Sequence, residues 1–424
     1  MRNQEYFKNK KITILGLARS GVACANLLFK LGAKVSVTDI KNDSSTKDAC
    51  SKLVAGAISV ELGKHSVEFI EQADLVVISP GVPPESPAVK LAAEFNKPVI
   101  SEIEVASILC PAPIIAVTGA NGKTTVTTLI GLILKEAKKK VFVCGNIGNP
   151  FCSQLEDIKE KDVVVLEVSS FQLEAIKDFK PKIAVILNLT PNHLDRYNNL
   201  QEYFEAKKRI FANQDKTDFL VLNSDDPRLA GLKGQAKSEI VFFKQEPGLN
   251  SNQSVVLAVG VILGIQKDLI LKVFREFKGI EHRMEELAQI KGVRFINDSK
   301  ATTADSAIWA IKNIENPVVL IAGGRHKGID YRVILESARG KVKQAVLLGE
   351  AKGKIAQDLK GAFPLVMADT LEDAVDKAYS LANAGDCILF SPMCSSYDMF
   401  KDYEERGKVF KKIIEELAVK INHG

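Results

Sequence analysis

The sequence contains no long uninterrupted run of apolar residues. A membrane-spanning helix needs about 18 or more such residues in a row, and no segment of the 424-residue chain approaches that length. A basic stretch at 8–11 precedes the apolar run 12–17, as in a signal peptide, but this run is too short and fits a first β-strand better. We therefore expect a cytoplasmic protein without stable membrane insertion.

Paired cysteines and nucleic-acid-binding tracts are also missing. The seven cysteines are scattered, odd in number and form no Cys-x-x-Cys pair, which argues against disulfides and structural zinc. Lysine groups such as 138–140 lack interleaved aromatic residues, which is typical of helix ends and not of a nucleic-acid surface. There is no internal repeat or low-complexity tract. The remaining default is a multi-domain enzyme, whose protein partners the sequence leaves unknown.

Short apolar strands alternate with helical patterns along the chain, which indicates parallel sheets. The length predicts about three domains, and we place them at 1–102, 103–280 and 281–424. The fold class expected is α/β, with Rossmann-like first and third domains and a central parallel-sheet domain of the P-loop ATPase type. Between about 235 and 255 the pattern weakens, which indicates a loop or a sheet edge. The predicted strands are 12–15, 35–39, 75–79, 114–117, 163–167, 183–188, 292–298, 318–324, 345–349 and 387–391.

The loop after the strand 114–117 is the strongest functional signal. It reads Thr-Gly-Ala-Asn-Gly-Lys-Thr-Thr over 118–125 and opens a helical pattern. Backbone N–H groups and a helix N-terminus at such a turn bind phosphate, while Lys123 would reach the β/γ-phosphates and Thr124 would bind Mg²⁺. Val117 stands where the general P-loop motif has its first glycine. The alternative is a glycine-rich turn with a solvated lysine.

The first turn of the chain is a weaker motif. Gly16 and Gly21 match a dinucleotide fingerprint, but Ala18 replaces its middle glycine. Asp39 ends the next strand, where such folds bind a ribose, although a solvated strand-end carboxylate is the alternative. The segment 79–84 forms a rigid turn at a strand end, where open α/β sheets bind ligands.

Two polar residues follow the strands beside the phosphate loop. Glu167 is a candidate Mg²⁺ ligand, or else a carboxylate favoured by a helix N-terminus. His193 is a second candidate ligand, or else a surface or capping group.

Together these motifs, in this order, resemble those of the Mur ligases over almost the whole chain. The segments 169–173 and 391–400 resemble those of the members that add D-glutamate. The matching segments are 118–125, 145–148, 166–173, 188–190 with 193–195, 281–283 and 297–302.

The resemblance implies an ATP-dependent ligase of peptidoglycan precursor synthesis. It would join D-glutamate to UDP-N-acetylmuramoyl-L-alanine through an acyl phosphate, releasing ADP and phosphate, with ATP and two Mg²⁺ ions. Such chemistry depends on positioning and charge neutralisation. The alternatives are another Mur-family amino-acid ligase, a folylpolyglutamate synthase-like enzyme, or a nucleotide-binding or NAD-linked module without catalysis; a complete ATP-site set opposes the last.

The resemblance also implies roles for individual residues. Lys207 takes the place of a carbamylated lysine that would bind the second Mg²⁺, although the adjacent Lys208 is the alternative. Only Asn252 carries over at the adenine side, Arg325 stands where aspartate is common, and Tyr403 stands where phenylalanine is expected. Asp298 and Lys300 resemble residues that close over ATP, although a surface ion pair between them is the alternative. The implied catalytic residues are Lys123, Asn146, His193 and Lys207. ATP would contact Gly119, Asn121, Gly122, Lys123, Thr124, Thr125, Asn252, Arg283, Asp298 and Lys300; UDP would contact Arg19, Ser20, Asp39, Gly81 and Asn146; D-glutamate would contact Thr302, Lys327, Ser396 and Tyr403; and the metal ligands would be Thr124, Glu167, His193 and Lys207.

Overall fold

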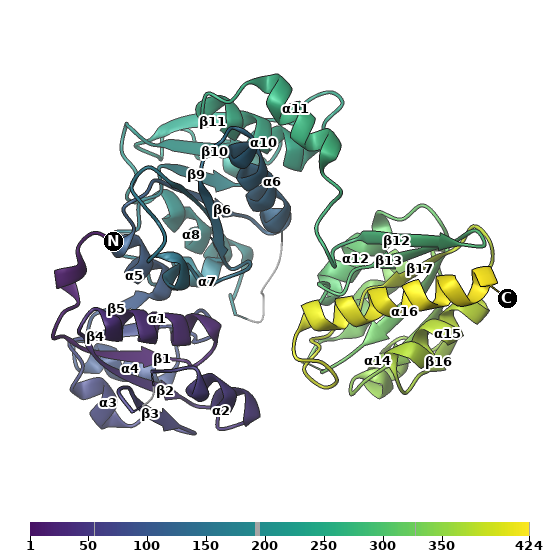
Figure 1. The fold of residues 1–424 in the computed structure, drawn as a ribbon, viewed down its shortest axis with the longest axis horizontal. Coiled ribbons are helices and arrows are strands. Elements are labelled where there is room, and N and C mark those ends of the chain that lie inside the picture. Colours follow the sequence, from purple (N-terminus) through teal and green to yellow (C-terminus); the bar gives the residue numbers. More distant parts are fainter. Residues whose placement is uncertain (55, 191–195, 327, 424) are drawn as a thin grey trace. The chain divides into compact units, whose positions relative to one another are not determined.

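The structure is a computed structural model that describes the chain apart from residues 55, 191–195, 327 and 424 (Figure 1). The chain divides into two compact units, residues 1–277 and 278–424. Across the described residues, no helix combines the length and the apolar character needed to cross a membrane.

The first unit begins with a parallel sheet. Its strand order is β3-β2-β1-β4-β5, so the chain crosses over between strands through helices, as the alternating pattern predicts. β4 is buried along its whole length, as expected for a strand covered on both faces. The strands are β1 (Lys11–Leu15), β2 (Lys34–Asp39), β3 (Ser59–Leu62), β4 (Leu75–Ile78) and β5 (Val99–Ser101), and the helices are α1 (Arg19–Lys30), α2 (Ser44–Ser51), α3 (Val67–Glu71), α4 (Pro87–Glu94) and α5 (Glu102–Leu109).

A second parallel sheet in the same unit has the order β11-β10-β9-β6-β8-β7. The segment in which the sequence pattern weakens forms the edge strand β11 and the start of α10, so the predicted sheet edge is correct. The strands are β6 (Ile114–Thr118), β7 (Val141–Gly145), β8 (Val163–Glu167), β9 (Ile183–Ile186), β10 (Phe219–Asn223) and β11 (Glu239–Phe243), and the helices are α6 (Lys123–Glu136), α7 (Ser170–Leu173), α8 (Leu200–Lys208), α9 (Pro227–Ala230), α10 (Ser251–Ile262) and α11 (Lys267–Glu276).

Two of the three hydrophobic clusters among the described residues of the first unit involve the second sheet. One packs α6, α10 and α11 on a single face of the second sheet, where Figure 1 shows the three helices together. The other is continuous from Ile14 in the first sheet, through Val105 in α5, to Leu166 in the second sheet. Because one core serves both sheets, they form a single compact unit.

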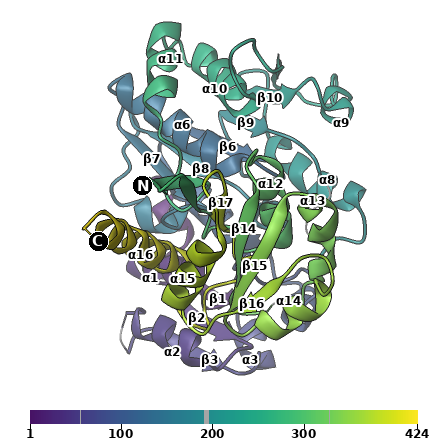
Figure 2. The same ribbon diagram turned by 90° about the vertical axis from the view of Figure 1, so that its right-hand side faces the viewer.

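The second unit contains one mixed sheet of order β12-β13-β17-β14-β15-β16, and Figure 2 shows β14, β15 and β16 side by side. We expected a wholly parallel sheet, but the edge strand β12 runs antiparallel to β13, to which a short turn at 291–292 joins it. The strands are β12 (Glu285–Ile290), β13 (Val293–Asn297), β14 (Val318–Gly323), β15 (Val342–Leu348), β16 (Leu365–Met367) and β17 (Cys387–Phe390), and the helices are α12 (Ala304–Lys312), α13 (Leu335–Ala338), α14 (Lys352–Asp358), α15 (Leu371–Leu381) and α16 (Tyr403–His423).

Candidate active site

The loop between β6 and α6 has a backbone that requires glycine at two places. Gly119 and Gly122 adopt φ angles of +154° and +84°, which side chains rarely tolerate. A Cβ atom on Gly119 would also lie 2.9 Å from the Cβ of Leu187, and one on Gly122 would lie 2.4 Å from Oδ1 of Asn252. The second contact brings Asn252, on α10, against the loop. The loop leads directly into the N-terminus of α6, and this geometry is suited to binding an anion.

Asn188, just beyond β9, braces this loop with its side chain. Its Oδ1 accepts hydrogen bonds from the backbone N–H groups of Ala120 and Asn121, at 3.1 and 2.9 Å, and its Nδ2 donates to the carbonyl oxygen of Asn121 at 3.0 Å. Asn121 in turn donates from Nδ2 to Thr190 at 3.3 Å. Asn188 is not among the site residues predicted from the sequence, although its place in a matching motif at the end of a buried strand is a signal that could identify it.

Two lysines meet at the carbonyl oxygen of Gly119. Lys123 donates to it and to the carbonyl of Ala120, both at 2.9 Å. Lys207, on α8, donates to the same oxygen at 3.0 Å and to Oγ1 of Thr118 at 3.3 Å. Lys208 instead pairs with Glu205. Of the two candidates, Lys207 is therefore the one beside the phosphate loop.

Lys207 is an unusual lysine because its side chain is almost completely buried, at 1% exposure. Burial lowers its pKa well below the ordinary value for a lysine, and the nearby charge of Lys123 lowers it further. A lysine with a depressed pKa has a larger neutral fraction at neutral pH, and the neutral amine is the nucleophilic form.

Glu167 ends β8 beside β6 and is buried. Its Oε1 accepts a hydrogen bond from Nδ2 of Asn146 at 2.8 Å, whereas its Oε2 is buried without a hydrogen-bond partner in the part of the chain that the structure describes. A buried carboxylate oxygen of this kind is suited to a cation. The motif that follows is partly structural, because Ser169 and Gln172 form the capping box that starts α7.

His193, the second predicted metal ligand, lies outside the described residues. Within the described chain, no group of three or more His, Cys, Asp or Glu side chains could hold a metal ion. Mg²⁺ commonly takes only one or two carboxylates and completes its shell with substrate phosphates and water. Glu167 and the buried Thr124, in the first turn of α6, fit such a site.

Four of the five predicted UDP residues lie at the carboxyl ends of β1, β2 and β4, whereas the fifth, Asn146, follows β7 in the second sheet and contacts Glu167. Asp39 accepts hydrogen bonds from the backbone N–H groups of Leu17 and Lys41 at 2.7 and 2.8 Å, so it shapes the glycine turn. The turn needs Gly21, whose Cβ would lie 2.1 Å from the carbonyl oxygen of Gly16. Arg19 donates from Nη2 to the carbonyl of Gly148 at 2.6 Å. The remaining two residues are Ser20, in the first turn of α1, and the exposed Gly81.

In the second unit, Asp298 follows β13 and lies next to the end of β17. Its Oδ1 accepts from the N–H of Met284 at 3.2 Å and its Oδ2 from the hydroxyl of Ser391 at 2.9 Å. Burial raises the pKa of Asp298 to about 7. Treating Asp298 and Lys300 as a surface ion pair is therefore wrong, because Asp298 is only 4% exposed.

Among the other predicted residues of this unit, Lys300 and Thr302 follow Asp298 on the same loop, and Tyr403 is the first residue of α16. The Lys300 ammonium is 5.6 Å from the centre of the Tyr403 ring. The N–H of Thr302 donates to the carbonyl of Lys300 at 2.9 Å, and Ser396 is buried after β17. Arg283 is half-buried beside Met284. Lys327 lies outside the described residues.

Arg406 was missed, and only the fold reveals its role. It is buried in α16 and donates to the carbonyl and hydroxyl oxygens of Ser299, at 2.8 and 3.0 Å, and to the carbonyl of Cys394 at 3.1 Å. It thereby ties the loop that carries Lys300 to the loop that carries Ser396. An arginine in a polar helix gives no such signal in the sequence.

Comparison with known proteins identifies the family. The family models for the Mur ligase MurD-like N-terminal domain, the Mur ligase middle domain and the Mur ligase glutamate ligase domain match residues 10–101, 117–260 and 282–394. Curated relatives include the UDP-N-acetylmuramoylalanine–D-glutamate ligases of Caldanaerobacter subterraneus subsp. tengcongensis, 40% identical over 97% of this chain and 99% of the relative, and of Geotalea uraniireducens, 41% identical over 96% and 98%. The chain belongs to the Mur ligase family.

Solved structures of other Mur ligases share the fold. MurF from Thermotoga maritima, in complex with ADP, aligns with a TM-score of 0.59 at 17% identity and covers 99% of this chain and 98% of its own. MurC from the same organism aligns with a TM-score of 0.57 at 19% identity, over 96% and 100%. At these identities the likeness concerns the fold. The α/β fold class and the Mur ligase resemblance expected from the sequence are thus confirmed.

Proposed function

We propose that this Mur ligase joins D-glutamate to UDP-N-acetylmuramoyl-L-alanine in the cytoplasm, converting ATP to ADP and phosphate. The observation that carries the proposal is the match, at about 40% identity over nearly the full length, to relatives that bear this name. The phosphate loop with its two lysines and the orphaned oxygen of Glu167 supports ATP chemistry in the first unit.

The reaction would run in two steps, the first at the γ-phosphorus of ATP and the second at the carboxyl carbon of the alanine. A carboxylate oxygen of the alanine attacks the γ-phosphorus, and the bond from that phosphorus to the bridging oxygen of ADP breaks. The amine of D-glutamate then attacks the acyl carbon, loses a proton, and expels phosphate together with the former carboxylate oxygen. The loop N–H groups, the N-terminus of α6 and Lys123 would hold the phosphates and their developing charge. Asn121, Thr125 and Asn252 would support the same nucleotide.

Magnesium fits the residues at the loop. Glu167, through its orphaned Oε2, and Thr124 would hold one ion, and when bound it would neutralise phosphate charge. Asn146 orients the Glu167 carboxylate through its hydrogen bond to Oε1. This assignment of the ion, and of His193 to a second one, is part of the proposal.

Lys207 would be carbamylated. Its depressed pKa favours the neutral amine, whose nitrogen forms a bond to the carbon of CO₂ and loses a proton, which gives a carbamate anion. The carbamate would place an anion beside Lys123, where it could bind the second Mg²⁺. Burial beside a second ammonium is the physical reason to select Lys207 and not Lys208.

The UDP group and D-glutamate would be bound by residues from different parts of the chain. The glycine turn with Arg19, Ser20 and Asp39, together with Gly81, would hold UDP, since a carboxylate that accepts two backbone N–H bonds can still accept from a ribose hydroxyl. In the second unit, Arg283, Asp298 and Lys300 would act on ATP. Thr302, Lys327, Ser396 and Tyr403 would hold the D-glutamate carboxylates, for which ammonium and hydroxyl donors are suited.

The experiment that tests the proposal is an amino-acid panel. Purified protein with ATP, Mg²⁺ and UDP-N-acetylmuramoyl-L-alanine is supplied in turn with D-glutamate, L-glutamate, L-alanine, L-lysine and diaminopimelate, and released phosphate is measured. We expect release with D-glutamate alone. Release with another amino acid and none with D-glutamate would overturn the proposal. UDP-N-acetylmuramate with L-alanine, and dihydrofolate with L-glutamate, are the controls for the alternative ligases.

A further inference from the structure

Arg196 connects the loop after β4, in the first sheet, to residues on the side of the second sheet. It follows the His193 motif in sequence, yet its guanidinium reaches the loop after β4 in the first sheet. Nη1 donates to the carbonyl of Pro80 at 3.0 Å and Nη2 donates to the carbonyl of Val82 at 3.3 Å. These two carbonyl groups flank Gly81, a residue expected to hold UDP.

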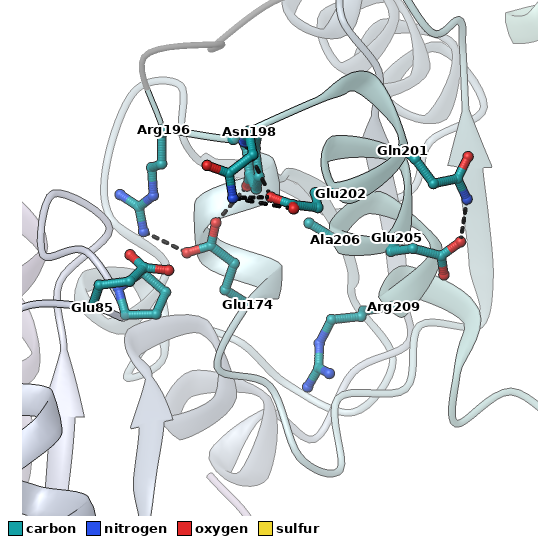
Figure 3. A pocket seen from close by; sticks show the side chains of 11 residues that line it. Glu85, Glu174, Arg196, Asn198, Gln201, Glu202, Glu205, Ala206 and Arg209 are labelled. Atoms are coloured by element: carbon teal, nitrogen blue, oxygen red, sulfur yellow. Dashed lines mark hydrogen bonds and ion pairs between the residues drawn. The ribbon is translucent and has the colours of Figure 1, made fainter.

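The guanidinium itself is fixed from the side of the second sheet. It forms an ion pair with Glu174 and lies 4.1 Å from the centre of the Phe171 ring. Glu174 also accepts a hydrogen bond from the hydroxyl of Tyr197 at 2.5 Å. The side chains of Arg196 and Glu174 are each only 11% exposed, so water competes little for these bonds. Figure 3 shows Arg196 and Glu174 paired at the wall of a cavity of about 540 Å³.

The loop that Arg196 holds is in contact with the glycine turn. Ser79 donates from its hydroxyl to the carbonyl of Gly16 at 2.8 Å, and a Cβ atom on Gly16 would lie 3.1 Å from a methyl group of Val82. Displacement of the loop 80–82 would therefore also displace the glycine turn. The contacts lead from Glu174, through Arg196 and the loop 80–82, to the turn that would bind UDP.

We infer that Arg196 is a positioning residue for the UDP end of the substrate. It holds the loop around Gly81 in a fixed register with the second sheet, so that a substrate bound by its UDP group presents its far carboxylate at the phosphate loop. The inference rests on the proposed function for its substrate. A lysine cannot reproduce it, since one ammonium does not have the planar fork that reaches both carbonyl groups and a carboxylate.

The test compares R196A and R196K with a matched control, R209A. Arg209 lines the same cavity and also donates to two backbone carbonyl groups, but both, Leu173 and Ile176, belong to the second-sheet side. We expect R196A to raise the KM for UDP-N-acetylmuramoyl-L-alanine about tenfold or more, the scale of a lost charge-assisted hydrogen bond. The KM values for ATP and D-glutamate should stay within about twofold, and R196K should lie between wild type and R196A. R209A should leave all three KM values within the same twofold range.

Equal changes in all three KM values, or no change, would overturn the inference. If R196A does not fold, E174Q removes the charge that fixes Arg196 and should raise the same KM selectively. Binding of UDP alone, measured by calorimetry, separates this inference from the proposed function. Wild-type protein that binds UDP but makes no product would overturn the function only, whereas equal UDP affinity in wild type and R196A would overturn the role of Arg196.

Discussion

At the scale of single residues, the site depends on groups whose ionisation is shifted by burial. Burial raises the pKa of Asp298 to about 7, whereas the pKa of an aspartate in the unfolded chain is near 3.8. Between these two values the folded protein binds more protons than the unfolded chain, so this group lowers the free energy of unfolding as the pH rises from about 4 to 7. Above pH 7 the full cost of the buried charge remains.

We predict that D298N removes this pH dependence while impairing the ligase. The asparagine keeps an acceptor for Met284 and a polar group for Ser391, but it carries no charge. The free energy of unfolding of D298N minus that of the wild type, measured by chemical denaturation, should be larger at pH 8 than at pH 5. The increase should be at most about 4 kcal/mol.

The control for this prediction is D330N. The hydrogen bonds of Arg332 lower the pKa of Asp330 to about 2, so Asp330 is ionised at both pH values. The effect of D330N should therefore be the same at pH 5 and pH 8. A D298N effect equally independent of pH would contradict the buried charge.

At this scale the sequence indicates which residues are candidates for the site, but not which of them are buried or what they contact. Lys207 and Lys208 are neighbours on one helix, and only the fold decides that the first is buried at the loop and the second pairs with Glu205. Asp298 likewise looked compatible with a surface pair, because burial depends on the neighbouring strand β17 and its Ser391. Such contacts join residues far apart in the chain.

At the scale of elements, the phosphate loop is shaped by a neighbouring strand as well as by its own glycines. We predict that N188A raises the KM for ATP about tenfold, since it removes the side-chain bonds to Ala120 and Asn121, which together are worth about 1–2 kcal/mol. The KM for the UDP substrate should change little, and steady-state kinetics measure both.

The matched control is N223A. Asn223 also stands at the end of a strand of this sheet, β10, but its side chain accepts from the N–H of Asp225, which lies outside the phosphate loop. It should leave the KM for ATP unchanged. If N188A lowers the melting temperature and leaves the KM for ATP unchanged, Asn188 is merely structural.

The elements themselves were predictable where the apolar pattern was strong. The predicted strand at 163–167 coincides with β8, because a strand covered on both faces is apolar along its length. β12 (Glu285–Ile290) was missed, because Glu285, Glu286 and Gln289 interrupt the apolar pattern of this half-exposed edge strand. Its antiparallel pairing follows from a hairpin-like turn that the pattern of parallel strands does not anticipate.

At the scale of the whole molecule, the chain forms two compact units, and the predicted ATP residues are divided between them. The boundary predicted between residues 102 and 103 falls within the first unit and stays a prediction. The joining contacts in this unit include that of Glu104, whose carboxylate accepts from the backbone N–H groups of Lys177, Asp178 and Phe179. A single sequence does not reveal such long-range pairs, whereas it did carry the motif order that identified the family.

The central claim is that phosphate is transferred to the substrate carboxylate before the amide bond forms. The most direct test uses UDP-N-acetylmuramoyl-L-alanine with oxygen-18 in both carboxyl oxygens, incubated with ATP, Mg²⁺ and D-glutamate, and mass spectrometry of the released phosphate. We predict one oxygen-18 atom in each phosphate formed, with the second retained in the amide product. Unlabelled phosphate, released together with amide product, would contradict the account.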